Sequence, residues 1–525
     1  MQLETFLENS AERFPQKTAI VCGKRRVTYA ELDAAANQLA HALIDHGVCR
    51  GDRVAIHLEN SVETVVSLFA ALKAGGVFLV INPTTKCEKL AYILNDCRAA
   101  ALIAPPGKWT DLTESTEETP HLKMAITIGK PIESARFGKA TSLDFDGLLN
   151  QFSSKTTPPA KRAIDVDLAA LVYTSGSTGN PKGVMLTHRN MVAAATSITT
   201  YLRNTAEDVI LSVLPLAFDY GLYQVLMSVK FGSTAILERS FAYPHAVMKK
   251  LVSERVTGFP LVPTMLAFLL RTDLTRYDLS DLRYVSNTGA ALPVDHIARF
   301  RKLVPHVQVF SMYGLTECKR VAYLPPEEID ERPGSVGRAM PNTEVFLVND
   351  DGQRLEDGST GELVVRGSNV MPGYWERPEE TAQALKPGWL PGEQVLYTGD
   401  MFRTDAEGYL YFVGRKDDII KSRGEKVSPK EVENTLCCHP AISEAAVLGV
   451  ADEVLGQSIC GFVTLRDGEQ INERDALRHC AQRLEDFMVP QSIEILPSLP
   501  KTSNGKVDRL QLKQMLEEAR QTACV

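Results

Sequence analysis

The sequence lacks the marks of a disulfide-bonded, metal-binding or nucleic-acid-binding protein. Its ten cysteines include no Cys-x-x-Cys pair, and only Cys437 and Cys438 are adjacent. Because adjacent cysteines rarely form a disulfide or a metal site, the pattern favours reduced, mostly buried thiols in a cytoplasmic protein. The net charge is −8 and no basic patch stands out, so we expect no nucleic-acid partner.

Long hydrophobic runs are missing as well. The longest apolar stretch, residues 65–81, is broken by Lys73 and by Gly75-Gly76, which leaves it too short to span a bilayer. The N-terminal residues Met1-Gln-Leu-Glu-Thr-Phe6 are acidic and polar and do not resemble a signal peptide. We therefore expect a chain without a membrane span.

The best-known phosphate-binding loop is also absent. That loop requires Gly-Lys followed by Ser or Thr, whereas here Pro181 precedes Lys182 and Gly183 follows it. Instead, an apolar run over residues 168–173 is followed by a string of hydroxyl groups and glycines: Thr174, Ser175, Gly176, Ser177, Thr178 and Gly179.

Such a string suits phosphate oxygens. Glycines let the backbone wrap closely around the oxygens, hydroxyl and N–H groups donate hydrogen bonds to them, and Lys182 adds a positive charge. We predict a loop that follows a buried strand and holds a polyphosphate, so that the chain consumes a nucleoside triphosphate. The alternative is an ordinary Gly/Ser surface loop.

The 525 residues exceed what a single hydrophobic core holds, so several lobes are expected. Residues 28–31, Thr-Tyr-Ala-Glu, form a capping-box signature that opens a helix, and Gly47 stands where this helix would end. The pattern then alternates between strands and helices, with strands at residues 53–58, 77–81 and 100–104 and helices at residues 62–74 and 87–95. This alternation predicts a doubly wound α/β lobe.

The later parts of the chain differ in texture. Residues 105–165 are polar and Pro-rich, and we expect a peripheral connection with one strand and one helix. The phosphate loop is expected to open a second α/β lobe. Residues 333–411 are broken by Asp-Gly and Gly turns, which predicts a β-rich lobe.

The predicted fold class is therefore α/β with two domains. Residues 1–414 form a large N-terminal domain of two α/β lobes plus the β-rich lobe. After Gly414 the chain returns to short helices and strands, so residues 415–525 are expected to form a small, mobile α+β domain.

Five motifs follow one another along the chain: the loop at residues 173–183, Tyr313-Gly-Leu-Thr-Glu317, Tyr397-Thr-Gly-Asp400, Gly414-Arg-Lys-Asp-Asp-Ile-Ile-Lys-Ser-Arg-Gly424 and Pro500-Lys-Thr-Ser-Asn-Gly-Lys506. In this order they resemble the adenylate-forming superfamily, which includes acyl-CoA synthetases, adenylation domains of nonribosomal peptide synthetases and beetle luciferases. The resemblance covers nearly the whole chain, and five motifs in order are much stronger evidence than any one of them.

The resemblance implies a two-step reaction that uses ATP and Mg²⁺. A carboxylate attacks the α-phosphate of ATP to give an acyl-AMP and pyrophosphate, and a thiol of coenzyme A or of a carrier protein's pantetheine then displaces AMP. The acyl-AMP is a mixed anhydride that must be kept from water, which a closing second domain can do.

The resemblance also implies which residues of the large domain bind the nucleotide. Glu317 would bind Mg²⁺, since an oxygen ligand that leaves room for water and phosphate suits that ion. Thr316 would contact the α-phosphate region, Asp400 would contact the ribose, and Arg415 would be a second contact to the ribose and phosphate. The other implied nucleotide contacts are Thr174, Ser175, Gly176, Ser177, Thr178, Gly179 and Lys182 at the phosphates, and Gly289, Ala290, Ala291, Tyr313 and Gly314 at the purine.

The C-terminal domain carries three further residues of the resemblance. Lys506 would bridge the attacking carboxylate and the α-phosphate oxygen in the first step. Asp417 corresponds to the hinge about which the small domain turns between the two steps. Gly424 corresponds to the glycine past which the pantetheine runs, and a glycine there leaves room for a thin chain.

Residues Phe218, Asp219, Gly221 and Thr288 are the candidates for the acyl pocket. The Phe-Asp pair is typical of amino-acid-activating domains, in which the aspartate binds the substrate's α-ammonium. A buried, unpaired carboxylate is costly, so Asp219 needs either such an ammonium or a local partner within the chain. The residues that follow Gly221 do not complete the amino-acid pattern, and Cys318-Lys319 after Glu317 departs from the commonest family pattern.

The leading functional prediction is a stand-alone acyl-CoA or acyl-carrier-protein synthetase acting on a small carboxylic acid. No carrier domain follows Lys506, so the thiol is expected to arrive on another molecule. The first alternative is a discrete amino-acid adenylation enzyme that loads a separate carrier protein. The second is a non-catalytic nucleotide-binding regulator with the same fold.

Overall fold

The computed structural model describes residues 1–106, 119–129, 140–174, 181–422, 425–452, 456–484, 488–502 and 505–523. The chain divides into two compact units. The large unit comprises residues 1–333, 337–345 and 365–396, and the small unit comprises residues 334–336, 346–364 and 397–525. The predicted limit between an N-terminal domain (residues 1–414) and a mobile C-terminal domain (residues 415–525) stays a prediction.

The first sheet of the large unit has seven strands in the order β7-β6-β5-β3-β4-β8-β9. All neighbouring strands are parallel except β8 and β9, which form an antiparallel pair. Their bounds are Arg53–Ile56 (β3), Val77–Val80 (β4), Ala99–Ala104 (β5), Met124–Thr127 (β6), Thr141–Asp144 (β7), Leu168–Thr174 (β8) and Lys182–Thr187 (β9). Strands β5 and β6 are buried along their whole length, as expected for parallel strands covered on both faces.

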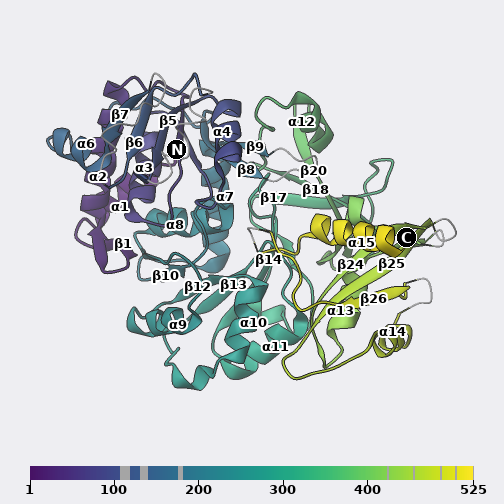
Figure 1. The fold of residues 1–525 in the computed structure, drawn as a ribbon. Helices are drawn as coiled ribbons and strands as arrows, with labels where there is room; N and C mark the ends of the chain where they lie inside the picture. The colour runs from purple at the N-terminus through teal and green to yellow at the C-terminus, as the bar shows by residue number, and fades with distance from the viewer. Residues whose placement is uncertain are drawn as a thin grey trace. The chain divides into compact units, whose positions relative to one another are not determined.

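Helices surround this sheet in the upper left of Figure 1: α2 (Tyr29–Asp45), α3 (Val62–Lys73), α4 (Cys87–Asp96) and α6 (Phe145–Gln151). Helix α2 begins where the capping box predicts, because the Thr28 hydroxyl accepts from the Glu31 N–H and the Glu31 carboxylate accepts from the Thr28 N–H. Helix α3 is buried along nearly its whole length, which explains its uniformly apolar sequence. The predicted alternation of strand and helix in this lobe is confirmed.

The second sheet of the large unit has nine strands in the order β16-β15-β14-β13-β12-β10-β11-β1-β2. The strands from β1 to β14 in this order are parallel neighbours, and β2, β15 and β16 are antiparallel. The bounds are Thr18–Cys22 (β1), Arg25–Thr28 (β2), Val209–Ser212 (β10), Thr234–Leu237 (β11), Gly258–Leu261 (β12), Tyr284–Asn287 (β13), Gln308–Tyr313 (β14), Ala322–Leu324 (β15) and Arg338–Ala339 (β16).

The helices of this second lobe are α1 (Thr5–Arg13), α7 (His188–Leu202), α8 (Asp219–Phe231), α9 (Pro244–Ser253), α10 (Pro263–Arg271) and α11 (Val294–Leu303). Helix α8 is buried on almost every side. In Figure 1, α9, α10 and α11 lie below the strands β10, β12 and β13.

Two expectations about the large unit are wrong. The phosphate loop does not open the second lobe, because β8 and β9 complete the first sheet, where β8 pairs with β4. The second sheet instead takes in the N-terminal strand β1, which pairs with β11. Residues 105–165 hold two strands, β6 and β7, rather than one. A periodic sequence pattern indicates a strand but does not say which distant strand is its partner.

The β-rich region after residue 333 is confirmed. Five strands form a sheet in the order β17-β18-β20-β19, with β21 paired to β20, and α12 (Pro378–Ala384) lies in the same region. The strand bounds are Thr343–Val348 (β17), Thr360–Gly367 (β18), Leu385–Pro387 (β19), Gln394–Thr404 (β20) and Leu410–Arg415 (β21).

The end of the small unit is an α+β assembly, as predicted. Its sheet has the order β23-β22-β25-β24, with β26 beside β25, and it buries Val432, Leu436, Val447 and Ile459 in one apolar core. The elements are β22 (Ile420–Ser422), β23 (Glu425–Val427), α13 (Pro429–Cys437), β24 (Ile442–Asp452), β25 (Gly456–Leu465), α14 (Glu473–Ala481), β26 (Ser492–Ile495) and α15 (Arg509–Ala523).

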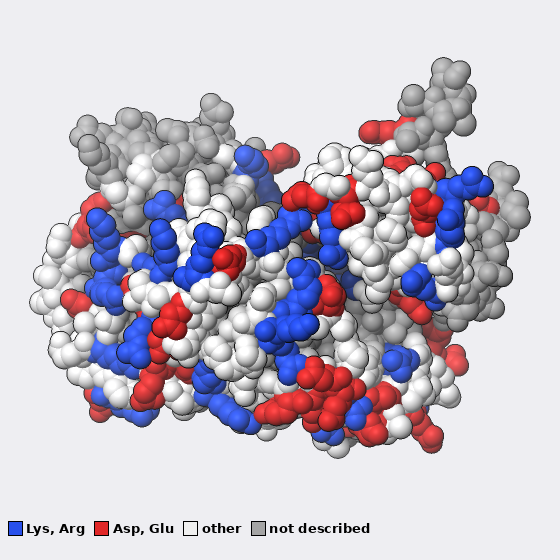
Figure 2. Space-filling model, turned by 90° about the horizontal axis from the view of Figure 1, so that it is seen from below, with Lys and Arg blue, Asp and Glu red and all other residues white. Residues whose placement is uncertain are grey.

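Basic and acidic side chains are interspersed on the face shown in Figure 2, in line with the 57 basic and 65 acidic residues of the chain. Within the part of the chain that the structure describes, no helix combines the length and the apolar character needed to cross a bilayer.

Candidate functional site

The candidate residues for the purine and for magnesium lie at the carboxyl ends of two parallel strands of the large unit. Strand β13 ends at Asn287 and leads into Thr288, and β14 ends at Tyr313 and leads toward Glu317. In open parallel sheets, ligands bind at this edge. Gly289, Ala290 and Ala291 are exposed there, and Gly289 has a φ of +84°, a backbone conformation that favours glycine.

One tyrosine connects two motifs that lie far apart in the sequence. The Tyr374 hydroxyl donates a hydrogen bond to Glu317 Oε1 over 2.8 Å. The Lys182 ammonium nitrogen lies 5.8 Å from the centre of the Tyr374 ring and 3.8 Å from Glu380 Oε1. The lysine of the phosphate loop and the predicted magnesium ligand therefore share a neighbour.

Backbone contacts hold this tyrosine along strand β9. Tyr374 forms a bridge with Val184, the Trp375 N–H donates to the Gly183 carbonyl over 2.7 Å, and the Met185 N–H donates to the Gly373 carbonyl over 3.0 Å. Sequence reasoning missed Tyr374. Two adjacent aromatic residues directly after Gly373, in a segment bounded by prolines, were the available signal.

The phosphate loop connects β8 to β9, and its two ends are paired. Thr174 and Lys182 are register partners across the antiparallel pair, so the loop between them closes a hairpin. Ser175, Gly176, Ser177, Thr178 and Gly179 lie outside the described residues.

The segment after Tyr313 turns sharply, and Gly314 makes the turn possible. A Cβ at Gly314 would overlap the carbonyl oxygen of Lys319, so a side chain does not fit. The Asn369 amide donates to the carbonyls of Cys318 (2.8 Å) and Arg320 (3.0 Å), which fixes the far side of the turn. The segment that carries Thr316 and Glu317 is thus rigidly supported.

Lys319 is fully buried behind this turn. Its ammonium donates to the Thr316 carbonyl over 2.8 Å. Burial lowers the pKa of Lys319 to about 8, while the nearby carboxylates of Asp219 and Glu317 oppose that effect. Burial also raises the pKa of the adjacent Cys318 thiol, so this cysteine stays protonated and unreactive.

Asp219 has a partner within the chain. It is the first residue of α8, and its Oδ2 lies 3.5 Å from Nη1 of Arg320, whose side chain is only 3% exposed. Of the two possibilities that the sequence left open, the structure supplies a partner within the chain, the Arg320 guanidinium.

The other acyl-pocket candidates differ in surroundings. Gly221 is buried, and a Cβ there would overlap the Pro215 carbonyl oxygen, so close helix packing explains the glycine. Thr288 is buried, and its hydroxyl has no hydrogen-bond partner among the described residues. Phe218 is half-buried immediately before α8.

In the small unit, two predicted ribose ligands are paired. Asp400 and Arg415 face each other across β20 and β21, with Arg415 Nη1 3.0 Å from Asp400 Oδ1. Asp400 is buried, whereas the Arg415 side chain is 54% exposed. Gly399 has a φ of +69°, which lets the strand turn immediately before the aspartate.

The remaining candidates of the small unit lie on loops and turns. Lys506 is exposed in a loop that the Lys501–Val507 bridge closes, and its carbonyl accepts from the Thr502 N–H over 2.8 Å. Asp417 lies in a short 3₁₀ turn, Lys416–Asp418 (η4). Gly424 lies outside the described residues.

Comparison with protein families decides the class. Residues 7–375 match the AMP-binding enzyme family, and residues 431–506 match the AMP-binding enzyme C-terminal domain. The chain belongs to the AMP-binding enzyme family.

Its similar proteins act on chemically different acids, to judge by their names. A long-chain-fatty-acid–CoA ligase of Bacillus subtilis (strain 168) is 33% identical over 98% of this chain and 94% of its own length. Tyrocidine synthase 2 of Brevibacillus parabrevis is 31% identical over 97% of this chain, which corresponds to 13% of that protein. The solved structure of the anthranilate CoA ligase AuaEII with anthranoyl-AMP has a TM-score of 0.87 and 28% identity, covering 99% of this chain and 98% of that one.

This AMP-binding enzyme is an AMP-forming carboxylate–thiol ligase. It activates a carboxylic acid with ATP to give an acyl-AMP and pyrophosphate, and it then transfers the acyl group to a thiol. The predicted family, fold and reaction class are confirmed.

Proposed function

We propose that ATP and Mg²⁺ bind in the large unit beside Lys182 and Glu317, and that the acid is adenylated there. The observation that carries this proposal is the contact of Tyr374 with both motifs, through a hydrogen bond to Glu317 and a ring beside Lys182. Phosphates require cations and Mg²⁺ requires carboxylate oxygens, so a lysine and a glutamate with a common neighbour suit a metal-bound polyphosphate.

A single carboxylate is enough for the magnesium ion. Across the described ranges, no group of three or more His, Cys, Asp or Glu residues could hold a metal ion. Mg²⁺ usually keeps several water ligands and binds through one or two carboxylates together with substrate phosphates. Glu317 fits that mode, and the Tyr374 hydroxyl orients its second oxygen. When bound, the ion would neutralise the charge of the phosphates.

The adenosine contacts follow from the same proposal. Tyr313 stacks on the purine beside the exposed backbone of Gly289, Ala290 and Ala291. Asp400, fixed by Arg415, accepts hydrogen bonds from the two ribose hydroxyls. Thr316 donates to the α-phosphate region.

We assign the lysine of the first step and the residues of the second step to the small unit. The exposed Lys506 bridges the carboxylate and the α-phosphate during adenylation, and the domain after residue 414 then turns about Asp417. Gly424 leaves room for the pantetheine of the incoming thiol.

The acceptor is free coenzyme A in a cytoplasmic reaction. In its favour, two of the similar proteins are CoA ligases by name, the long-chain-fatty-acid–CoA ligase of Bacillus subtilis and the anthranilate CoA ligase AuaEII. A carrier-protein acceptor is the alternative outcome of the test below.

The direct test measures pyrophosphate and AMP from ATP, Mg²⁺ and a panel of fatty, aromatic and amino acids. The reactions are run with coenzyme A, with a pantetheinylated carrier protein, or with neither. We expect pyrophosphate release without a thiol and AMP release that depends on coenzyme A. Absence of pyrophosphate with every acid would refute the proposal.

Half-reactions with Lys506→Ala separate the two steps. We expect the variant to lose acyl-AMP formation but to retain thioester formation from supplied acyl-AMP, because the lysine acts only in the first step. Arg509→Ala, a change in the same unit whose guanidinium binds Glu433, serves as the control that should leave the ratio of the two steps unchanged. Equal loss of both steps in Lys506→Ala would contradict the assignment.

A further inference from the structure

A buried group of charges lies at the carboxyl edge of the second sheet, next to the segment that carries Glu317. It consists of Asp219, Lys319 and Arg320. Lys319 is 0% exposed, Arg320 is 3% exposed, and the Asp219 side chain is 18% exposed. Arg320 pairs with Asp219, the Lys319 ammonium donates to the Thr316 carbonyl nearby, and none of the three side chains is needed for the nucleotide contacts described above.

Arg320 is held firmly in this position. Its Nη1 donates to the Lys319 carbonyl over 2.8 Å, and its guanidinium carbon lies 4.7 Å from the centre of the Tyr220 ring. The Tyr220 hydroxyl in turn donates to the Ser286 carbonyl over 2.6 Å. The backbone carbonyl of Arg320 accepts from Asn369. With both ends anchored, the guanidinium cannot turn away from Asp219 without breaking several contacts.

Asp219 is consequently stabilised from inside the protein. Its carboxylate lies 3.5 Å from Arg320 and stands in the first turn of α8, where the helix N-terminus favours negative charge. In an amino-acid-activating pocket, by contrast, the substrate must supply the cation. Here that cation is a side chain of the enzyme.

We propose that Arg320, by pairing with Asp219, makes this enzyme selective for carboxylic acids that carry no α-ammonium group. The inference rests on the proposed function, because it concerns the acid bound at the same edge of the sheet. Arg320 acts here as a specificity-determining residue through Asp219 and takes no part in the chemical steps.

Charge supports this selectivity. An ammonium that approached Asp219 would meet a carboxylate that Arg320 already pairs, with the buried Lys319 as a further cation nearby. Like charges that meet in such a place cost several kcal/mol and act as a filter against the wrong partner.

Hydrogen-bond capacity gives a second, independent argument. The Nε–H of Arg320 is buried and has no hydrogen-bond partner among the described residues. An ammonium can only donate hydrogen bonds, so it cannot satisfy this group. A hydroxyl, carbonyl or water oxygen can accept from it.

The test uses pairs of acids that differ only in the α-ammonium group, such as 3-phenylpropanoate with phenylalanine and octanoate with 2-aminooctanoate. The readout is kcat/KM for ATP-dependent pyrophosphate release by the wild-type enzyme. We expect the amine-free member of every pair that reacts to be preferred by at least about tenfold, because the ammonium meets like charge. A preference for the amino acids would overturn the inference and leave the proposed function intact.

Two variants test whether Arg320 causes the preference. Arg320→Met exposes the Asp219 charge to the substrate, and we expect the ratio of amino acid to amine-free acid to rise about tenfold or more. The double variant Asp219→Asn/Arg320→Met removes both charges together, so its ratio should rise less than in Arg320→Met, in which the unpaired Asp219 attracts the ammonium. A merely structural role would lower kcat/KM for both acids alike, so an unchanged ratio in a folded Arg320→Met enzyme would overturn the inference.

If Arg320→Met fails to fold, the inference is still tested by the acid pairs with the wild-type enzyme and by the charge-balanced double variant. The double variant leaves no orphaned charge, and a thermal melt confirms its fold. We expect it to lose discrimination between the members of a pair, and full retention of the wild-type ratio would overturn the inference. Pyrophosphate release with neither member of any pair would refute the proposed function and this inference with it.

Discussion

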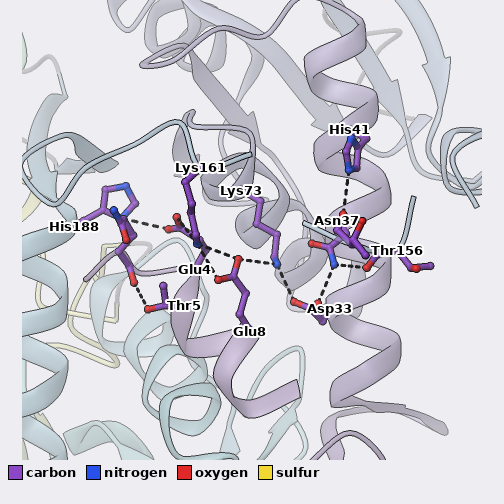
Figure 3. A network of polar contacts seen from close by, with 12 residues as sticks. Glu4, Thr5, Glu8, Asp33, Asn37, His41, Lys73, Thr156, Lys161 and His188 are labelled. Carbon is purple, nitrogen blue, oxygen red and sulfur yellow. Dashed lines mark hydrogen bonds and ion pairs between the residues drawn. The ribbon is translucent and has the colours of Figure 1, made fainter. Parts of the chain in front are cut away.

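The large unit contains two groups of charged residues that differ in their surroundings. In the first, which we call the N-terminal network, Lys73 lies 3.2 Å from Glu8 and 2.9 Å from Asp33, and Lys161 lies 3.3 Å from Glu4 and 2.8 Å from Glu8 (Figure 3). Two cations thus face three carboxylates. In the second, Arg320 pairs with Asp219, and Lys319 lies near the carboxylates of both Asp219 and Glu317.

The two groups of charged residues also lie in different parts of the large unit. The N-terminal network joins α1, α2, α3 and the connection before β8, and Asn37 extends it by donating to Asp33 and to the Thr156 carbonyl (Figure 3). Its excess negative charge is limited by burial, which raises the pKa of Glu4. The second group stands at the carboxyl edge of a parallel sheet, the edge at which open sheets bind ligands. A charge group that joins helices away from that edge serves the fold, whereas one at the edge can also contact a ligand.

The comparison predicts that damage to the N-terminal network lowers stability and leaves catalysis unchanged. Lys73→Met should lower the free energy of unfolding by about 3 kcal/mol, because it leaves Glu8 and Asp33 facing each other without their shared cation. Denaturant unfolding measures the loss, and kcat/KM of the folded fraction should not change. A folded Lys73→Met enzyme with impaired adenylation would show that this network also serves the active site.

The pH dependence of stability gives the next largest effect. His188 accepts a hydrogen bond from the Leu3 N–H through Nδ1, and burial lowers its pKa from the ordinary 6.5 to about 4. Its 3.6 Å contact with Glu4 is therefore not an ion pair at neutral pH. Between pH 6.5 and 4 the unfolded histidine binds more protons than the folded one, so stability falls as the pH is lowered through this window.

A difference of about 2.5 in the pKa of His188 between the unfolded and the folded protein lowers the free energy of unfolding by about 3 kcal/mol at the acidic end of this window. His188→Gln removes the titrating group, and the Gln carbonyl can still accept from Leu3. We expect the difference in unfolding free energy between wild type and variant to change with pH between 6.5 and 4, in favour of the variant at low pH. Parallel pH profiles would contradict the assignment of a neutral histidine. Glu4, whose pKa is raised, is present in both proteins and cancels in the difference.

Local signals were enough for part of the fold and of the site. The Thr28 capping box correctly predicted the start of α2, because it depends on residues three apart. The strand–helix alternation likewise gave the α/β class. The sheet to which β8 and β9 belong was not predictable, since it depends on a pairing between β8 and β4 that no local pattern encodes.

The site shows the same limit. The motif residues Lys182, Glu317 and Asp400 could be recognised from short segments of sequence. Tyr374 and Arg320 could not, because each acquires its place through contacts with residues distant in the chain: Tyr374 with Glu317, and Arg320 with Asp219. Cys318-Lys319 departed from the family pattern, and the structure places both residues fully buried behind the turn that carries Glu317.

Tyr374→Phe should weaken both catalysis and stability. The variant keeps the ring beside Lys182 and loses only the hydrogen bond to Glu317. Because the acceptor is a charged carboxylate, this bond contributes about 1.5 to 3 kcal/mol. We expect kcat/KM for pyrophosphate release to fall by about tenfold or more and the Mg²⁺ concentration at half-maximal rate to rise. Tyr411→Phe, a change in the small unit that removes a hydroxyl 3.3 Å from Asp405, is the matched control and should leave the Mg²⁺ dependence as it is. An unchanged Mg²⁺ dependence in Tyr374→Phe would separate this tyrosine from the metal site.

Lys161→Met is expected to have the smallest effect, and it tests whether burial decides the strength of an ion pair. Lys161 contacts two carboxylates, Glu4 and Glu8, much as Lys73 contacts Glu8 and Asp33, but its side chain is 45% exposed against 1% for Lys73. Because water screens an exposed pair, we expect a loss of about 1 kcal/mol or less in the free energy of unfolding. Denaturant unfolding of the two Lys→Met variants at low and high salt makes the comparison direct. Only the loss in Lys161→Met should shrink with added salt, since buried pairs are screened much less. Equal losses in both variants would mean that the number of carboxylate partners, and not burial, decides the strength of the network.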